Sequence, residues 1–413
     1  MHKHVIHEAA SRLSAIALSE IVQISEKARA LRAEGRDILA FSTGEPDFPT
    51  PPEVIEAAHR AALDGQTGYP PTAGSPRLRA AVAEKHGRTP VEVIISTGAK
   101  QVLANAMLAT LGPGDEVIIP APYWTSYADI VRMAEGVPVI VPCGMESGFK
   151  LMPEDLEAAI TSRTRWAMLN SPTNPSGAVY SAQEFAALAA VLEGHPRIWV
   201  LSDEIYEHLS YAHFTSFTEA ASKLQERTLV VNGVSKAWSM TGWRIGWGVG
   251  PAALIRDMTA VQGQVTSGAC SISQAAACAA LAMGPEILAE RRASFEARRD
   301  LAVAGLNAMP GLDCPVPEGA FYCFPSCAAF LSGAGGFESD AAFCEWLLET
   351  AGVALVPGRA FGMPGHLRLS FAYAEAQIAD GLARMKDALE HLPACPPGAD
   401  NTDADDGQSP DRT

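Results

Sequence analysis

Between residues 91 and 250 the chain alternates short apolar runs with helix-like stretches. Seven such runs occupy residues 91–97, 115–122, 137–142, 165–171, 197–204, 227–235 and 243–250. Most of these runs are continuously apolar rather than alternating, which is typical of strands buried on both faces of a parallel sheet. The pattern predicts an α/β fold in which helices cover both faces of a mostly parallel, seven-stranded sheet.

The two ends of the chain show other patterns. Apolar residues at spacings near 3.6 predict a helix from Ser14 to Arg36, and Gly35 favours its end there. After about residue 285 a long charged helix is followed by shorter strand-like runs at 318–325, 353–358 and 366–371, which predict a smaller α+β domain.

These patterns predict five parts. We expect a flexible N-terminus at 1–12, an N-terminal helical segment at 13–45 that packs with the small domain, and a large domain at 46–288. A small domain follows at 289–394. The last segment, 395–413, is acidic and lacks bulky apolar side chains, which is typical of a disordered tail.

Composition narrows the classes of partner. The 413 residues carry a formal net charge of −16, which argues against nucleic acid or an anionic membrane surface as a partner. No apolar run reaches the length of a membrane span, and the first residues do not resemble a secretion signal. The eight cysteines show no C-x-x-C spacing, so we expect reduced thiols, no metal site and a cytoplasmic protein.

Polar residues follow several of the predicted strands, where ligands of open parallel sheets bind. At Gly98 and Ala99 a strand turns into a helix, which favours an anion, although an ordinary turn has the same pattern. Asn-containing turns occupy residues 170–177. Asp203 lies near the end of the run at 197–204, after the apolar residues RIWVL, where it is either a solvated strand end or the partner of a protonated pyridine nitrogen.

Lys236 differs from most of the other lysines because it follows an apolar strand and precedes Trp238 and Met240. A lysine in such surroundings has a lowered pKa and becomes a usable amine nucleophile. Arg244 adds a cation on the next strand. The G-x-G-x-G within residues 243–250 lacks the spacing of a dinucleotide fingerprint. A carboxylate, a lysine that can form a Schiff base and an arginine for a phosphate are what pyridoxal 5′-phosphate (PLP) requires, so we favour PLP as the cofactor.

The segment SKAWSMTGWRIG at 235–246 closely resembles the PLP-lysine motif of the class I aminotransferases. GEPDFPTP, NSPTNPSG, SDEIYE and EGAFY resemble the other motifs of that family in the same order, and the resemblance extends from about Ser14 to Leu392. It is closest to the bacterial aspartate aminotransferases, a subgroup that includes prephenate-using members. The resemblance implies the PLP-dependent transferase fold of type I.

The resemblance assigns roles to matching positions. Lys236 is expected to carry PLP as a Schiff base and to move a proton between Cα and C4′, Asp203 to keep the ring nitrogen protonated, and Tyr206 to bind the ring O3′. The other implied cofactor-binding residues are Gly98, Ala99, Trp124, Asn174, Ser235, Arg244 and Tyr69. Tyr69 is expected to reach the phosphate of a neighbouring subunit, which implies a homodimer with shared active sites.

The implied substrate-binding residues are Gly44, Lys100, Trp124, Asn174 and Arg368. Arg368 is expected to pair with the substrate α-carboxylate, and Lys100 with the distal carboxylate of an acidic substrate. The leading expectation is therefore transfer of an amino group from aspartate or another acidic L-amino acid to 2-oxoglutarate. The family does this by a ping-pong mechanism through pyridoxamine phosphate.

One segment departs from the subgroup. Where its members often have K-P-S-A-T, this chain has residues 17–21 (ALSEI), and Ile21 is expected to make the entrance more apolar. Aromatic or other neutral amino acids therefore remain an alternative. A PLP lyase, decarboxylase or acyl transferase and a non-catalytic ligand sensor are also possible on this fold, but the retained Lys236, Lys100 and Arg368 favour transamination.

Overall fold

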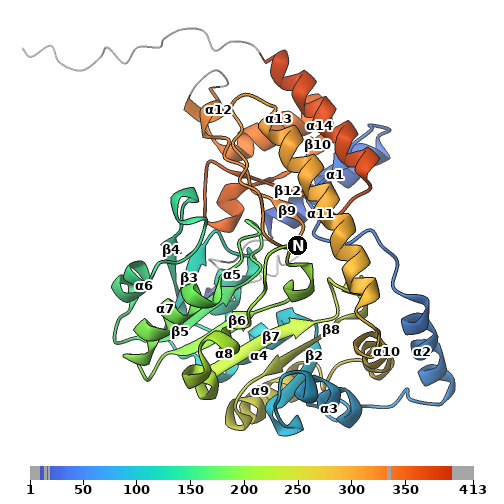
Figure 1. Cartoon of the computed structure of the whole chain (residues 1–413), viewed down its shortest axis with the longest axis vertical. Coiled ribbons are helices and arrows are strands. Elements are labelled where there is room, and N and C mark those ends of the chain that lie inside the picture. The colour runs from blue at the N-terminus through green and yellow to red at the C-terminus, as the bar shows by residue number, and fades with distance from the viewer. Residues whose placement is uncertain (1–9, 14–15, 17–18, 333–335, 393–413) are drawn as a thin grey trace, which may run out of the picture.

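The computed structural model describes residues 10–13, 16, 19–332 and 336–392. The tail expected at 395–413 and most of the N-terminus expected at 1–12 lie outside the described residues. Figure 1 shows a large part built on a central sheet and a smaller part above it, with the helix α11 running from one to the other.

The central sheet has seven strands in the order β2-β8-β7-β6-β5-β3-β4. Their bounds are β2 Val93–Thr97, β3 Glu116–Ala121, β4 Val137–Pro142, β5 Thr164–Asn170, β6 Trp199–Asp203, β7 Thr228–Gly233 and β8 Ile245–Val249. All neighbouring pairs are parallel except those that β8 makes with β2 and β7. Each strand overlaps one predicted apolar run, so the expected sheet is confirmed.

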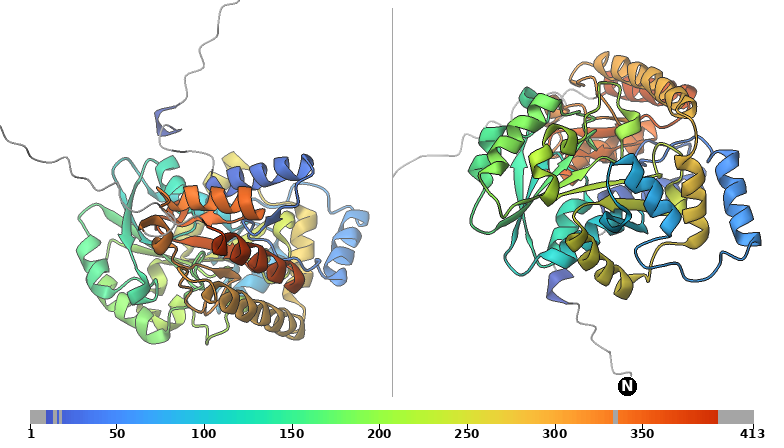
Figure 2. Two further views of the ribbon diagram at one scale, coloured as in Figure 1. Left: turned by 90° about the horizontal axis from the view of Figure 1, so that it is seen from above. Right: turned by 60° about the horizontal axis from the view of Figure 1, so that its bottom comes forward.

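Helices cover both faces of this sheet (Figure 2). Residues of β5 alternate between the two faces, with Trp166 and Met168 packed into one core cluster and Ala167 and Leu169 into another. One face is covered by α4 (Ala99–Thr110), α5 (Ser126–Met133) and α9 (Ala252–Val265). The opposite face is covered by α3 (Pro76–Lys85), α6 (Pro153–Ala159), α7 (Ala182–Glu193), α8 (Phe217–Ala220) and α10 (Ser271–Leu281), and α2 (Pro52–Leu63) packs on α10.

The smaller part combines helices with two small sheets. One sheet is antiparallel in the order β11-β12-β9, and the other pairs β1 with β10 in parallel. The strands are β1 Leu39–Ala40, β9 Tyr322–Cys323, β10 Val353–Ala354, β11 Val356–Pro357 and β12 Leu367–Ser370. The helices are α1 Glu20–Ala33, α11 Glu286–Asn307, α12 Ala328–Ser332, α13 Asp340–Ala351 and α14 Glu375–Glu390.

The pairing of β1 with β10 joins the N-terminal segment to the C-terminal part of the chain. The boundary expected between residues 288 and 289 falls inside α11, and the division into domains stays a prediction. The described residues also form 3₁₀ helices at Ser11–Leu13, Pro90–Glu92, Met145–Ser147, Glu207–Leu209, Ser222–Arg227, Thr241–Trp243 and Gly358–Phe361.

Three expected elements differ from the structure. The helix expected to begin at Ser14 begins at Glu20, because Ser19 has the extended backbone angles φ −51° and ψ 133°. The strand expected at 318–325 is reduced to β9, since Ala320 has a φ of 57° that an extended strand cannot accommodate. The run at 353–358 forms two strands, because its halves pair with different partners.

No single helix in the described part of the chain is long and apolar enough to cross a membrane. The helices α10 and α11 meet the requirement of length and composition only as a pair, with a bend of 86° between them.

Candidate active site

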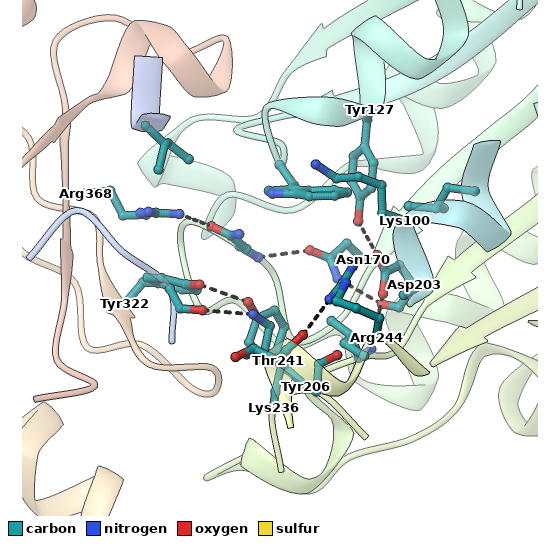
Figure 3. Close-up of a pocket in the computed structure, with 18 residues that line it drawn as sticks. Lys100, Tyr127, Asn170, Asp203, Tyr206, Lys236, Thr241, Arg244, Tyr322 and Arg368 are labelled. Atoms are coloured by element: carbon teal, nitrogen blue, oxygen red, sulfur yellow. Dashed lines mark hydrogen bonds between the residues drawn. The ribbon is translucent and has the colours of Figure 1, made fainter. Parts of the chain in front are cut away.

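A cavity of about 300 Å³ lies where the carboxyl ends of the central strands meet the smaller part of the molecule. Figure 3 shows its lining side chains, which come from both parts. Eleven of the residues selected from the sequence line it: Gly44, Ala99, Lys100, Trp124, Asn174, Asp203, Tyr206, Ser235, Lys236, Arg244 and Arg368. The structure therefore brings together residues that are more than 300 positions apart in the chain.

Lys236 extends into this cavity from the segment that follows β7. Its Nζ donates a hydrogen bond to the carbonyl oxygen of Gly44 at 2.8 Å. Burial lowers the pKa of Lys236 to about 8, an effect that the negative charge of Glu45 opposes. An amine with this pKa is in part unprotonated near neutral pH and can act as a nucleophile.

Asp203 is the buried carboxylate of the cavity and ends β6. Burial raises its pKa to about 6, and hydrogen bonds from two donors oppose that rise. Tyr127 donates its O–H to Oδ2 at 2.7 Å, and the backbone N–H of Ile205 donates to Oδ1 at 3.2 Å. Asn170 donates to the Asp203 carbonyl oxygen at 2.9 Å, so backbone and side chain are both held.

The turn between β2 and α4 has the geometry of an anion site. Gly98 has a φ of 79°, and a Cβ on it would lie 2.5 Å from Nη2 of Arg244. A Cβ on Gly246 would lie 2.2 Å from the backbone nitrogen of Ala99, so both glycines permit close contact here. The first N–H groups of α4, which begins at Ala99, have no acceptor within the helix and attract an anion together with Arg244.

Arg368 is fully buried on β12. Its Nη1 donates to Oδ1 of Asn174 at 3.0 Å and its Nη2 to the carbonyl oxygen of Ser42 at 2.6 Å. The guanidinium lies 4.4 Å from the ring centre of Tyr322 and 4.9 Å from that of Phe361. Its Nε has no hydrogen-bond partner among the described residues, and burial lowers its pKa.

Lys100 is another cation of the cavity without a carboxylate partner among the described residues. Its Nζ lies 4.8 Å from the ring centre of Trp124, and no carboxylate of the described residues pairs with it. Burial, and then the positive charge of Arg244, lower the pKa of Lys100. Ile21 lines the same cavity from the first turn of α1, while Ala17 and Leu18 lie outside the described residues.

The cavity residues that were not selected from the sequence include Tyr127, Asn170 and Tyr322. The Tyr322 hydroxyl lies 3.0 Å from that of Tyr206. Burial raises the pKa of Tyr206 well above its usual range. Asn170 and Tyr322 belong to the motifs NSPTNPSG and EGAFY, and Tyr127 follows Trp124 by three positions. That spacing places two residues on one side of a helical turn, which was the available signal.

Two selected residues do not line the cavity. Gly98 lies next to the Arg244 guanidinium, because a Cβ on it would be 2.5 Å from Nη2 of that residue. Tyr69 is 94% exposed and lies in a turn beside residues 266–272, where a separate hollow of about 340 Å³ is found. Ser271 donates a hydrogen bond to the carbonyl oxygen of Gly68, which fixes this turn on the start of α10.

The residues present fit PLP as a cofactor. A lysine of lowered pKa, a buried carboxylate, an anion site at a helix N-terminus and an aromatic ring line one cavity. These groups match the aldehyde, the ring nitrogen, the phosphate and the ring face of that molecule. Arg368 and Lys100 then remain available for carboxylates of a substrate.

Comparison with known proteins gives one consistent result. The model of the family described as aminotransferase class I and II matches residues 36–385. An aspartate aminotransferase of Rhizobium meliloti (strain 1021) is 50% identical over 397 residues, which cover 93% of this chain and 97% of that relative. An aspartate/prephenate aminotransferase of Cereibacter sphaeroides is 49% identical over 386 residues, which cover 91% and 96%.

Solved structures agree with this result. The crystal structure of the aspartate aminotransferase from Rhizobium meliloti superimposes with a TM-score of 0.90 at 49% identity, covering 94% of this chain and all of that one. The aspartate aminotransferase of Thermus thermophilus with maleate gives a TM-score of 0.87 at 42% identity, covering 93% of this chain and all of that one.

Proposed function

The chain belongs to the class I and II aminotransferases, and on this basis we propose that it transfers the amino group of an acidic L-amino acid, aspartate first, to 2-oxoglutarate. PLP is the proposed cofactor. The observation that carries the substrate class is the pair of cations Lys100 and Arg368, which line one cavity without a carboxylate partner in the described part of the chain.

The electrostatics of the cavity favour a dicarboxylate. A cation removed from water is costly unless an opposite charge pairs with it, and both Lys100 and Arg368 have a pKa lowered by burial. A substrate with two carboxylates supplies one partner to each cation. Aspartate, glutamate and 2-oxoglutarate all carry two carboxylates, so one arrangement of residues serves both halves of a ping-pong exchange.

When bound, PLP supplies a carbonyl carbon that receives the amino group and a protonated ring that withdraws electrons from the substrate Cα. The proposed roles of this chain's residues follow from their positions. Asp203 would hold the protonated ring nitrogen, Arg244 with the N-terminus of α4 would bind the phosphate, and Trp124 would pack on the ring. Tyr206 and Asn174 would bind the ring oxygen.

Lys236 holds the cofactor and, once released by the incoming amino group, acts as the base that moves a proton at the substrate Cα. Its lowered pKa of about 8 suits this role, because a base is most effective when its pKa lies near the working pH. The bond from its Nζ to the Gly44 carbonyl places the amine beside a backbone segment of the substrate site.

We propose a homodimer in which Tyr69 of one subunit completes the phosphate site of the other. A tyrosine that is 94% exposed is unusual for a large aromatic side chain, and it borders a hollow lined by residues 66–70 and 266–272. Gel filtration with light scattering tests whether the chain forms a dimer. The activity of a mixture of Tyr69→Phe and Lys236→Ala subunits tests whether the two subunits share their sites.

The proposed substrate class is tested by single-turnover conversion of the PLP-loaded enzyme with each of the twenty amino acids. Aspartate and glutamate are expected to convert the cofactor to its amine form fastest. Lys100→Met is expected to lower kcat/KM for aspartate roughly 10- to 100-fold, as loss of one charged hydrogen bond does. The value of kcat/KM for alanine is expected to stay unchanged. Lys223→Met, at an exposed lysine of the same domain, is the matched control.

Neutral and aromatic amino acids are the second candidate class, because Ile21 and Leu103 give the cavity apolar walls. Faster conversion by phenylalanine than by aspartate would select this candidate and would remove the proposed role of Lys100. Product analysis separates transamination from other PLP reactions. Formation of glutamate from 2-oxoglutarate supports the proposal, and release of carbon dioxide without glutamate contradicts it.

A further inference from the structure

Tyr127 lies behind the carboxylate of the cavity, in the first turn of α5. Its side chain is buried, and its O–H donates to Oδ2 of Asp203 at 2.7 Å (Figure 3). The other oxygen, Oδ1, accepts the backbone N–H of Ile205 at 3.2 Å. Among the described residues Tyr127 is therefore the one side chain that hydrogen-bonds this carboxylate.

Tyr127 also contacts the ring beside the cavity. Its ring packs edge to face on Trp124, with 5.5 Å between ring centres and an angle of 85°. The backbone N–H of Tyr127 donates to the Trp124 carbonyl oxygen at 2.9 Å. One residue thus contacts both the carboxylate and the aromatic ring that line the cofactor cavity, through its hydroxyl in the first case and through its ring in the second.

The hydroxyl acts on the charge of Asp203. Burial disfavours the carboxylate form, and the Tyr127 hydrogen bond is the largest influence in the opposite direction. Burial and the negative charge of Asp203 raise the pKa of Tyr127 well above its usual range. The phenol therefore keeps its proton and remains a donor to Asp203.

Resting on the proposed role of Asp203 toward the cofactor ring, we propose that Tyr127 is a positioning residue of the reaction, whose hydroxyl keeps Asp203 oriented and charged. A carboxylate that accepts a strong hydrogen bond is a weaker base. With Tyr127 in place, the proton shared between Asp203 and the ring nitrogen resides on the nitrogen. Without the hydroxyl, Asp203 becomes more basic and draws that proton toward itself.

The test uses the full chain loaded with PLP that is labelled with ¹⁵N in the ring. Tyr127→Phe keeps the ring that packs on Trp124 and removes only the hydroxyl. Tyr180→Phe is the matched control, because Tyr180 is also buried in the same part of the molecule, and its hydroxyl accepts a backbone hydrogen bond from Leu151. Thermal unfolding of all three proteins shows whether each variant is folded.

We expect the ¹⁵N resonance of Tyr127→Phe to move toward that of unprotonated pyridine, and kcat to fall roughly 10- to 100-fold with little change in KM. Tyr180→Phe is expected to retain the wild-type resonance. If the phenylalanine variant does not fold, 3-fluorotyrosine at position 127 provides the test with the hydroxyl present. Its more acidic phenol donates more strongly, so the resonance is expected to move in the opposite direction.

An unchanged resonance in Tyr127→Phe overturns this proposal while leaving the proposed function intact, because it shows that the hydroxyl does not influence the ring nitrogen. A shift of equal size in Tyr180→Phe also overturns it. A wild-type chain that takes up no PLP, or whose ring nitrogen is unprotonated, overturns the proposed role of Asp203 and this proposal with it.

Discussion

Glu204, the neighbour of Asp203, offers a sharp test of how burial controls a carboxyl group in this protein. It is 1% exposed, and its Oε1 accepts hydrogen bonds from Ser202 Oγ at 2.8 Å, Ser216 Oγ at 2.9 Å and Phe217 N at 3.1 Å. Its Oε2 has no hydrogen-bond partner among the described residues. Burial, and then the charge of Glu207, raise the pKa of Glu204 from 4.5 to about 8.

The sign of the pH effect follows from this shift. A carboxyl whose pKa is higher in the folded protein binds its proton more tightly there, so its contribution to stability is fully present below about pH 4.5. That contribution is lost as the pH rises through about 8. One proton corresponds to about 1.4 kcal/mol per pH unit, so the wild-type chain is expected to lose about 2–3 kcal/mol from this group between pH 5 and 7.

Glu204→Gln removes the titration and keeps an oxygen for the three donors. We expect the free energy of unfolding of the variant, measured in urea, to rise relative to that of the wild type by about 2–3 kcal/mol as the pH increases from 5 to 7. Glu290→Gln, at an exposed position of α11, is the control and is expected to run parallel to the wild type. If Glu204→Gln and the wild type lose stability in parallel, Glu204 is ionised in the folded protein and the reasoning is wrong.

Three further substitutions probe other parts of the structure. Gly98→Ala is expected to weaken PLP binding at least tenfold in a fluorescence titration, because its Cβ would lie 2.5 Å from Nη2 of Arg244; unchanged affinity would contradict this role. Arg368→Lys is expected to lower kcat/KM for every amino acid roughly 10- to 100-fold, whereas an amine without a carboxylate should react as before. Phe185→Ala is expected to cost about 3–5 kcal/mol in urea unfolding, because the ring is buried and stacks on Tyr180 at 5.0 Å; a loss below 1 kcal/mol would show that the site collapses.

Much of the fold could be predicted because the central strands are buried on both faces. Most strands of the large sheet are apolar over most of their length, as in 166–169, and polar helix surfaces separate them. Periodicity does not report where backbone angles change. Ala320 interrupts a strand-like run ahead of β9 with a positive φ, and α1 begins only after the extended Ser19, although neither residue type signals this locally.

Some residues of the candidate site could likewise be predicted from the sequence and others could not. Lys236 and Asp203 could be selected because each is a polar residue directly after an apolar strand, and family motifs include both. Tyr127 hydrogen-bonds a residue 76 positions away, and the Tyr322 hydroxyl contacts that of Tyr206, which is 116 positions away. Such contacts depend on how strands and helices are assembled, so one sequence without a structure does not reveal them.

The charge of the chain and the charge of the site have opposite signs, and the reason is geometric. The net charge of −16 is an average over the whole sequence, but Lys100, Lys236, Arg244 and Arg368 all line one cavity in which Asp203 is the carboxylate. Charges on the surface are screened beyond roughly 8 Å at physiological salt, whereas groups within a cavity interact at short range with little water between them. The energy of a bound anion is therefore set by the cations of the cavity, each from a different segment of the chain. For this reason a protein with a negative net charge can still bind a dianionic substrate in such a cavity.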